Sequence, residues 1–176
     1  MQKILDRGAQ IADLLTALRF ILVLILIALI PGGTGNLNIF LIVLYAAWST
    51  DVLDGYFARL SGKEGKLGKY DGYVDSLMYV TTFLYSTSMD IYSFKFFFLI
   101  ILTNIITVTV TRNLEVNQAF HFLYILLGFN ALSKLSIRWF YTTIIWTIIV
   151  IFLKRNRLKV QIITFINSWK RLFTGK

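Results

Sequence analysis

The sequence contains no cysteine, one proline and one histidine among its 176 residues. Without cysteine it holds neither a disulfide bond nor a thiolate metal site, and the lone His121 excludes a zinc site built from several histidines. Charged residues are also scarce, at 15% of the chain against about 25% in soluble domains, whereas 57% of the residues are hydrophobic. The chain is therefore too apolar for an ordinary soluble domain, and its length predicts a single domain over residues 1–176.

Long apolar runs fill most of the chain and predict an all-α integral membrane protein. A membrane-spanning helix needs about 20 apolar residues, and six segments approach that length. A Pro-Gly-Gly-Thr-Gly breaker at residues 31–35 ends the first of them. Residues 1–12 mix charged and apolar side chains, which favours an amphipathic N-terminal helix in the membrane interface. The six transmembrane helices are predicted at residues 11–31, 37–59, 71–88, 91–111, 117–133 and 136–153.

The net charge of +9 is distributed in a way that indicates membrane lipids as partners and no nucleic acid. Seven of the 18 Lys and Arg residues lie in the tail 154–176, where residues 157–173 predict a second interfacial helix. Basic residues that flank apolar spans are typical of cytoplasmic loops and of contact with anionic lipids. With six spans most basic loops fall on one side, which we expect to face the cytoplasm, although Lys134 and Arg138 fall on the other.

Four of the seven aspartates lie within 25 positions, at the junction of the second and third predicted spans. Asp51 and Asp54 are three residues apart, and Asp71 and Asp75 are four apart, so each pair shares one face of a helix. Because one short loop joins the two spans, we expect them to be antiparallel neighbours with both pairs at similar depth. Four carboxylates this close repel one another unless cations lie between them. The pattern therefore predicts a carboxylate cage that holds one or two Mg²⁺ or Mn²⁺ ions.

Small and basic residues accompany the acidic pairs. Gly55 and Ala58 follow the first pair, and Gly68 precedes the second. Small side chains let helices approach closely, and they also leave room for a flat ligand. Ordinary helix packing explains them equally well, and nearby basic residues can form plain surface salt bridges with the carboxylates or bind phosphate. The basic residues concerned are Arg59, Lys66 and Lys69.

These residues, taken together, closely resemble the signature of the CDP-alcohol phosphotransferases, integral membrane enzymes of phospholipid synthesis. Thr16 and Arg19 in the first span are also similar to the family's opening segment, although Ala12-Asp13 replaces its usual Pro-Asn. One spacing departs from the family, since two residues separate the last glycine from the third aspartate where three are usual. On a helix, this places Gly68 about 100° around the axis from its usual position. The matching pattern reads Asp51-x2-Asp54-Gly55-x2-Ala58-Arg59-x8-Gly68-x2-Asp71-x3-Asp75.

The resemblance implies metal ligands, a general base and a nucleotide slot. It implies that an alcohol displaces CMP from the β-phosphate of a CDP-linked lipid donor, and that the enzyme is a homodimer. The acceptor is open among glycerol 3-phosphate, which we prefer, inositol phosphate, serine and phosphatidylglycerol. The implied metal ligands are Asp51, Asp54, Asp71 and Asp75, of which Asp75 is also the catalytic base, and the implied nucleotide-binding residues are Gly55, Ala58, Arg59 and Gly68.

Two other classes of membrane protein use aspartates with cations. Polyprenyl transferases bind Mg²⁺ through aspartate pairs, but they are usually longer and lack the Gly-x2-Ala-Arg continuation. A cation transporter or channel would spread its acidic residues over several spans at mid-membrane, whereas here they cluster on two. Metal-dependent release of CMP from a CDP-lipid distinguishes the three classes.

Overall fold

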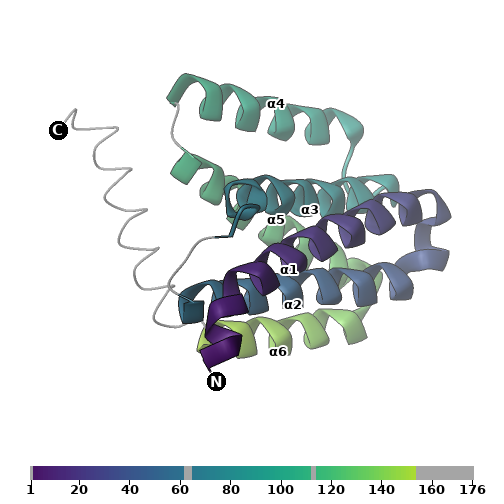
Figure 1. The fold of residues 1–176 in the computed structure, drawn as a ribbon. Coiled ribbons are helices and arrows are strands. Elements are labelled where there is room, and N and C mark those ends of the chain that lie inside the picture. The colour runs from purple at the N-terminus through teal and green to yellow at the C-terminus, as the bar shows by residue number, and fades with distance from the viewer. Residues whose placement is uncertain (1, 62–64, 112–113, 154–176) are drawn as a thin grey trace. The chain divides into compact units, whose positions relative to one another are not determined.

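A computed structural model describes residues 2–61, 65–111 and 114–153, and within these ranges every regular element is helical. Figure 1 shows the elements in chain order. The chain divides into two compact units, Met1–Ile91 and Tyr92–Lys176. The elements are α1 (Gln2–Leu29), the 3₁₀ segment η1 (Ile30–Asn36), α2 (Leu37–Ser61), α3 (Gly68–Ser88), α4 (Phe94–Thr111), α5 (Leu114–Leu135) and α6 (Ile137–Leu153).

All six apolar segments of the sequence are helices, so the all-α prediction is confirmed. Within the described residues, two stretches are long and apolar enough to cross a membrane: Arg7–Ser61, which contains both α1 and α2, and Phe94–Thr111. Ile137–Leu153 is apolar but shorter. The count of six spans and the single-domain organisation stay predictions.

The N-terminal segment is the beginning of a longer helix. α1 runs without a break from Gln2 to Leu29, so residues 1–12 and the first apolar span belong to one helix. The interfacial position of residues 1–12 stays a prediction. The interfacial helix predicted at 157–173 lies outside the described residues.

One buried stripe along α1 organises the first unit. Ala12, Thr16, Arg19, Val23 and Leu26 are all buried, at alternating spacings of four and three residues. This spacing keeps one face of a helix turned toward its neighbours. α1 packs against both α2 and α3 (Figure 1), whereas α2 and α3 meet each other mainly through side chains. The two acidic helices, which the sequence predicted as neighbours, therefore also share α1 as their common neighbour.

The buried stripes change from apolar to polar at one end. On α1 the change falls between Val23 and Arg19, and on α2 it falls between Ala47 and Thr50, with Asp54 one turn further. The outward side of α1 stays apolar, and Leu14 and Ile21 are more than half exposed. Apolar side chains on both the inner and outer faces are typical of a helix surrounded by lipid. The polar site thus begins where the apolar core of the first unit ends.

The breaker after the first span acts as the sequence predicted. α1 ends at Leu29, whose carbonyl accepts a hydrogen bond from the Asn36 side-chain amide at 3.0 Å. Gly33 has φ of 54°, a left-handed conformation that favours glycine. Its carbonyl accepts a hydrogen bond from the Tyr85 hydroxyl at 2.7 Å, and the Tyr85 ring stacks on Phe40 at 3.8 Å between centroids. The turn is therefore tied to α3 as well as to α2.

In the second unit, α5 packs against both α4 and α6. The Asn104 amide donates to the Tyr124 hydroxyl at 3.0 Å, which links α4 to α5. The Asn130 amide donates to the Tyr92 hydroxyl at 2.7 Å, and that hydroxyl donates to the Leu127 carbonyl at 2.9 Å. Polar side chains in apolar surroundings need such partners, because an unpaired amide or hydroxyl there is costly.

We expect Gly8→Ala to lower the thermal stability of the protein. A Cβ atom on Gly8 would lie 2.8 Å from the Phe57 carbonyl oxygen and 2.8 Å from the Ser61 Cβ, so α1 and α2 would have to separate, at a cost of about 1–3 kcal/mol. Gly72→Ala is the matched control, because Gly72 is exposed in α3 and has nothing within 4 Å of its Cβ position. Thermal unfolding in detergent measures both variants, and equal Tm values would contradict the close helix crossing.

Candidate active site

The structure brings carboxylates of α2 and α3 together. One oxygen each from Asp51, Asp54 and Asp71 lie within 4.8 Å of one another. Asp54 is buried at 5% exposure, whereas Asp51 and Asp71 are half-buried. Asp75 is half-buried one helical turn beyond Asp71 and lies outside this set of three. The convergence of the two acidic pairs that the sequence predicted is thus present, with three of the four carboxylates in the tightest group.

A buried arginine of α1 lies among these carboxylates. The side chain of Arg19 is fully buried, and its Nη1 donates hydrogen bonds to Asp71 at 2.8 Å and to Asp75 at 2.6 Å. The same nitrogen lies 3.7 Å from Asp51, and Nη2 donates to Asp54. All four predicted site aspartates are therefore paired with a single guanidinium.

Sequence reasoning did not assign Arg19 to the acidic cluster and instead considered the basic residues nearest to the cluster along the chain. Arg59, Lys66 and Lys69 are all exposed, and none of them is within ion-pair distance of the cluster in the part of the chain that the structure describes. A signal for Arg19 was present, because an ionisable residue in the middle of an apolar span is a functional candidate by default.

The donor set fits a divalent cation. Hard cations such as Mg²⁺ and Mn²⁺ prefer carboxylate oxygens. Opposite oxygens around Mg²⁺ are about 4.2 Å apart, so the carboxylates of Asp51, Asp54 and Asp71, within 4.8 Å, need to move little to share an ion. A single guanidinium offsets only one of four carboxylate charges, so a further cation at this position is electrostatically favourable.

The small residues predicted for the nucleotide slot lie next to the carboxylates along their helices. Gly55 and Ala58 are half-buried and follow Asp51 by four and seven residues, so the three share one face of α2. Gly68 begins α3, is exposed and has nothing within 4 Å of its Cβ position. It precedes Asp75 by seven residues, or two turns, so it lies on the acidic face of α3 despite the shortened spacing. The nucleotide-binding roles of these residues stay predictions.

Asp13 of α1 holds the loop that leads into α3. Its two carboxylate oxygens accept hydrogen bonds from the backbone N–H groups of Lys66 at 3.0 Å and Leu67 at 2.7 Å. Gly65 lies so close that a Cβ there would be 2.1 Å from Asp13 Oδ1. Because α3 begins at Gly68, Asp13 also places negative charge at the positive end of that helix. The sequence marked Asp13 only as a departure from the family pattern, and its contact with the loop was not predicted.

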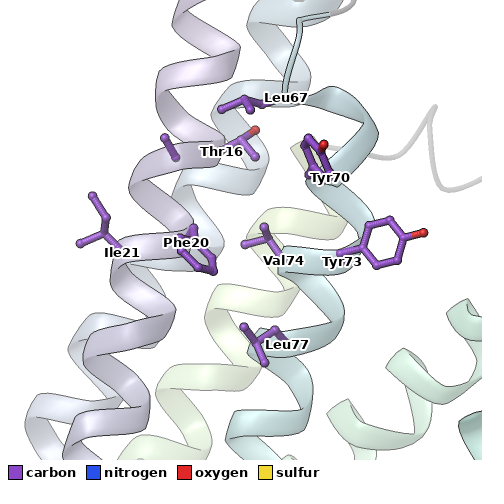
Figure 2. Close-up of a pocket in the computed structure, with 9 residues that line it drawn as sticks. Thr16, Phe20, Ile21, Leu67, Tyr70, Tyr73, Val74 and Leu77 are labelled. Atoms are coloured by element: carbon purple, nitrogen blue, oxygen red, sulfur yellow. The ribbon is translucent and has the colours of Figure 1, made fainter.

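An apolar cavity of about 550 Å³ lies between α1 and α3. Its size is within the range of about 300–1,000 Å³ that small-molecule sites occupy. Tyr70 and Val74, which line it, directly precede Asp71 and Asp75 in α3. Sequence reasoning did not predict this cavity. Figure 2 shows its lining, which consists of Thr16, Ala17, Phe20, Ile21, Leu67, Tyr70, Tyr73, Val74 and Leu77.

Residues 9–169 match the CDP-alcohol phosphatidyltransferase family, a range that contains the whole acidic cluster with Arg19 and Asp13. This protein belongs to the CDP-alcohol phosphatidyltransferase family. Comparisons with curated proteins and with solved structures found no match.

CDP-alcohol phosphatidyltransferases are membrane-integral transferases of phospholipid biosynthesis that depend on a divalent metal. They transfer a phosphatidyl group from a CDP-alcohol to an acceptor. The resemblance seen in the sequence is thereby confirmed, and this enzyme class is favoured over the polyprenyl transferases and the cation transporters.

We expect Asp13→Ala to destabilise the protein by about 0.5–2 kcal/mol, the range for losing a side-chain acceptor at a helix start. Asp13→Asn should have an intermediate effect, because an amide has one acceptor oxygen where the two bonds to Lys66 and Leu67 use both carboxylate oxygens. Chemical or thermal unfolding in detergent gives the comparison. Equal stability of Asp13→Ala and the unchanged protein would show that the loop does not need this tie.

Proposed function

We propose that this CDP-alcohol phosphatidyltransferase uses the acidic cluster as a metal-dependent active site for the transfer of a phosphatidyl group from CDP-diacylglycerol to a small polar alcohol, with release of CMP. The observation that carries the proposal is the convergence of Asp51, Asp54 and Asp71 within 4.8 Å in a chain of this family. Buried carboxylates at this density are retained for function more often than for stability.

Three side chains are proposed to hold the cation and a fourth to move the proton. Asp51, Asp54 and Asp71 would hold Mg²⁺ or Mn²⁺, which when bound polarises the pyrophosphate and offsets the charge that develops on CMP. The acceptor hydroxyl oxygen attacks the β-phosphorus, the bond to the bridging oxygen breaks, and CMP leaves with the electron pair. Asp75 accepts the hydroxyl proton as general base. Its Oδ1 is held at 2.6 Å by Arg19, which supports a fixed orientation for that role.

The nucleotide is proposed to lie along the open face of α2 and the start of α3. Gly55 and Ala58 share the face of Asp51 and have no bulky side chains, which leaves room for cytidine. Gly68 has open space at its Cβ position. Arg59 is exposed on the last turn of α2, where its guanidinium can reach pyrophosphate oxygens.

The cavity between α1 and α3 supports a donor with an apolar tail. Most of its lining is apolar, and Val74 and Leu77 extend along α3 away from the acidic end. A headgroup at the carboxylates and a hydrocarbon chain among these side chains would each have suitable surroundings. We therefore propose a lipid-linked donor in preference to a water-soluble one.

The acceptor is proposed to be glycerol 3-phosphate. Lys66 and Lys69 are exposed around the start of α3, where a phosphorylated acceptor finds positive charge.

We also propose a six-span topology with the site on the cytoplasmic side, which the basic loops support, and the homodimer that the family resemblance implies.

The deciding experiment supplies purified protein with CDP-diacylglycerol and one candidate alcohol at a time, and follows CMP. We expect CMP release to need Mg²⁺ or Mn²⁺, to stop with a chelator, and to be fastest with glycerol 3-phosphate. CMP release with serine, inositol phosphate or phosphatidylglycerol, but not with glycerol 3-phosphate, would overturn the acceptor assignment. Undiminished turnover after complete removal of divalent metal would overturn the metal-dependent site.

We expect Asp75→Asn to lower turnover by about 10²–10⁴-fold, because a carboxamide cannot accept the acceptor's proton. Binding of CDP-diacylglycerol should remain measurable by equilibrium titration. Asp90→Asn is the matched control: Asp90 lies in the turn after α3 with φ of 58°, a conformation that asparagine also tolerates, and its turnover should be unchanged. Full activity of Asp75→Asn would remove the general-base assignment.

We expect Ala17→Trp to raise KM for a long-chain CDP-diacylglycerol by about tenfold, or roughly 1.4 kcal/mol, because the indole fills the cavity between α1 and α3. A short-chain donor should be affected less. Val110→Trp is the control for adding tryptophan to a membrane enzyme, since Val110 is 76% exposed on α4. If KM changed equally for long-chain and short-chain donors, the cavity would not be the site of the tail.

A further inference from the structure

Arg19 lies among the four aspartates of the acidic cluster, but the proposed reaction gives it no primary role. It is fully buried, it comes from a different helix than the four carboxylates, and its two terminal nitrogens donate to three of them. A fully desolvated arginine is costly unless its charge and its donors are satisfied. Here the satisfying groups are the same carboxylates that would hold the metal.

We propose that Arg19 is an internal counter-cation that competes with the divalent ion for the carboxylates of the cage. In the ion-free protein it holds the four carboxylates together. When the ion binds, Arg19 withdraws from Asp54 and Asp71 and keeps its bond to Asp75. The proposal rests on the function proposed above, because it takes the acidic cluster to be the metal site.

The competition follows from shared atoms and like charge. Arg19 Nη2 bonds Asp54 and Nη1 bonds Asp71, and both of these residues belong to the group of three that can share an ion. A guanidinium and a divalent cation side by side repel each other strongly where water is excluded. Both cannot therefore occupy their best positions at the same time.

Asp75 and Thr50 define where the guanidinium can stay. Asp75 lies outside the group of three, and its 2.6 Å bond to Arg19 Nη1 does not use a carboxylate of that group. Arg19 Nε lies 3.4 Å from Thr50 Oγ1, a contact on the stem side of the guanidinium. A rotation about this end releases Asp54 and Asp71 while Asp75 remains bonded. Arg19 is then a positioning residue that acts on the reaction through Asp75.

The test measures Mn²⁺ binding to the whole protein in detergent, without substrate, by electron paramagnetic resonance. For Arg19→Gln we expect Mn²⁺ to bind about tenfold more tightly than in the unchanged protein, because a competing positive charge is gone. Arg19→Lys, which keeps the charge but has no planar fork to bridge three carboxylates, should fall between the two. Arg7→Gln removes the same charge from an exposed position on α1 and should bind Mn²⁺ with unchanged affinity.

Thermal stability provides a second measurement that separates this role from simple packing. Without metal, Arg19→Gln should have a clearly lower Tm than the unchanged protein, and saturating Mn²⁺ should narrow that difference. If Arg19 only filled space in the core, the Tm difference would be the same with and without Mn²⁺. A variant that is recovered folded only in the presence of Mn²⁺ would support the proposal in the same way.

The outcomes distinguish this proposal from the proposed function. Equal or weaker Mn²⁺ binding by both Arg19→Gln and Arg19→Lys, in a protein that still releases CMP with Mn²⁺, overturns the competition and leaves the enzyme assignment standing. If neither the unchanged protein nor any variant binds Mn²⁺, the competition and the metal site both fall. Tighter binding in a protein that releases no CMP supports the competition and removes the proposed reaction.

Discussion

Four carboxylates in apolar surroundings cannot stay together without positive charge among them, and this constraint explains the architecture of the first unit. α2 and α3 each carry an acidic pair, and both pack against α1 as a common neighbour. α1 supplies the required charge through Arg19, one helical turn from the apolar side chains that seal the core. The same buried stripe therefore does two things: its apolar part holds the helices together, and its polar part holds the acidic pairs in register.

Much of the fold could be predicted from the sequence because its signals are local. Pro31 and the glycines after it end the first helix where expected, and each predicted apolar run lies largely within one helix. The i,i+3 and i,i+4 spacings placed each acidic pair on one face. The family signature lies within 25 residues, so it too could be recognised without knowledge of the fold.

The parts of the site that the sequence did not predict depend on contacts between distant segments. Arg19 is 35 residues from Asp54 and 52 from Asp71 along the chain, whereas the basic residues that seemed the natural partners are close in sequence and exposed in the fold. Asp13 reaches a loop 53 residues away. Helical periodicity shows which face a residue occupies, but it does not show which helix that face meets.

The order of the buried charges along the chain has a consequence for biosynthesis. The ribosome completes α1 before it makes any of the four carboxylates, so Arg19 has none of its acidic partners when α1 is first made. An arginine at the centre of a membrane-spanning helix disfavours insertion by about 2.5–3.5 kcal/mol. The leucines and isoleucines of α1 offset this, at about 0.3–0.6 kcal/mol each near the helix centre. The buried charge of Arg19 thus gains its partners only once α2 and α3 have followed α1 in synthesis.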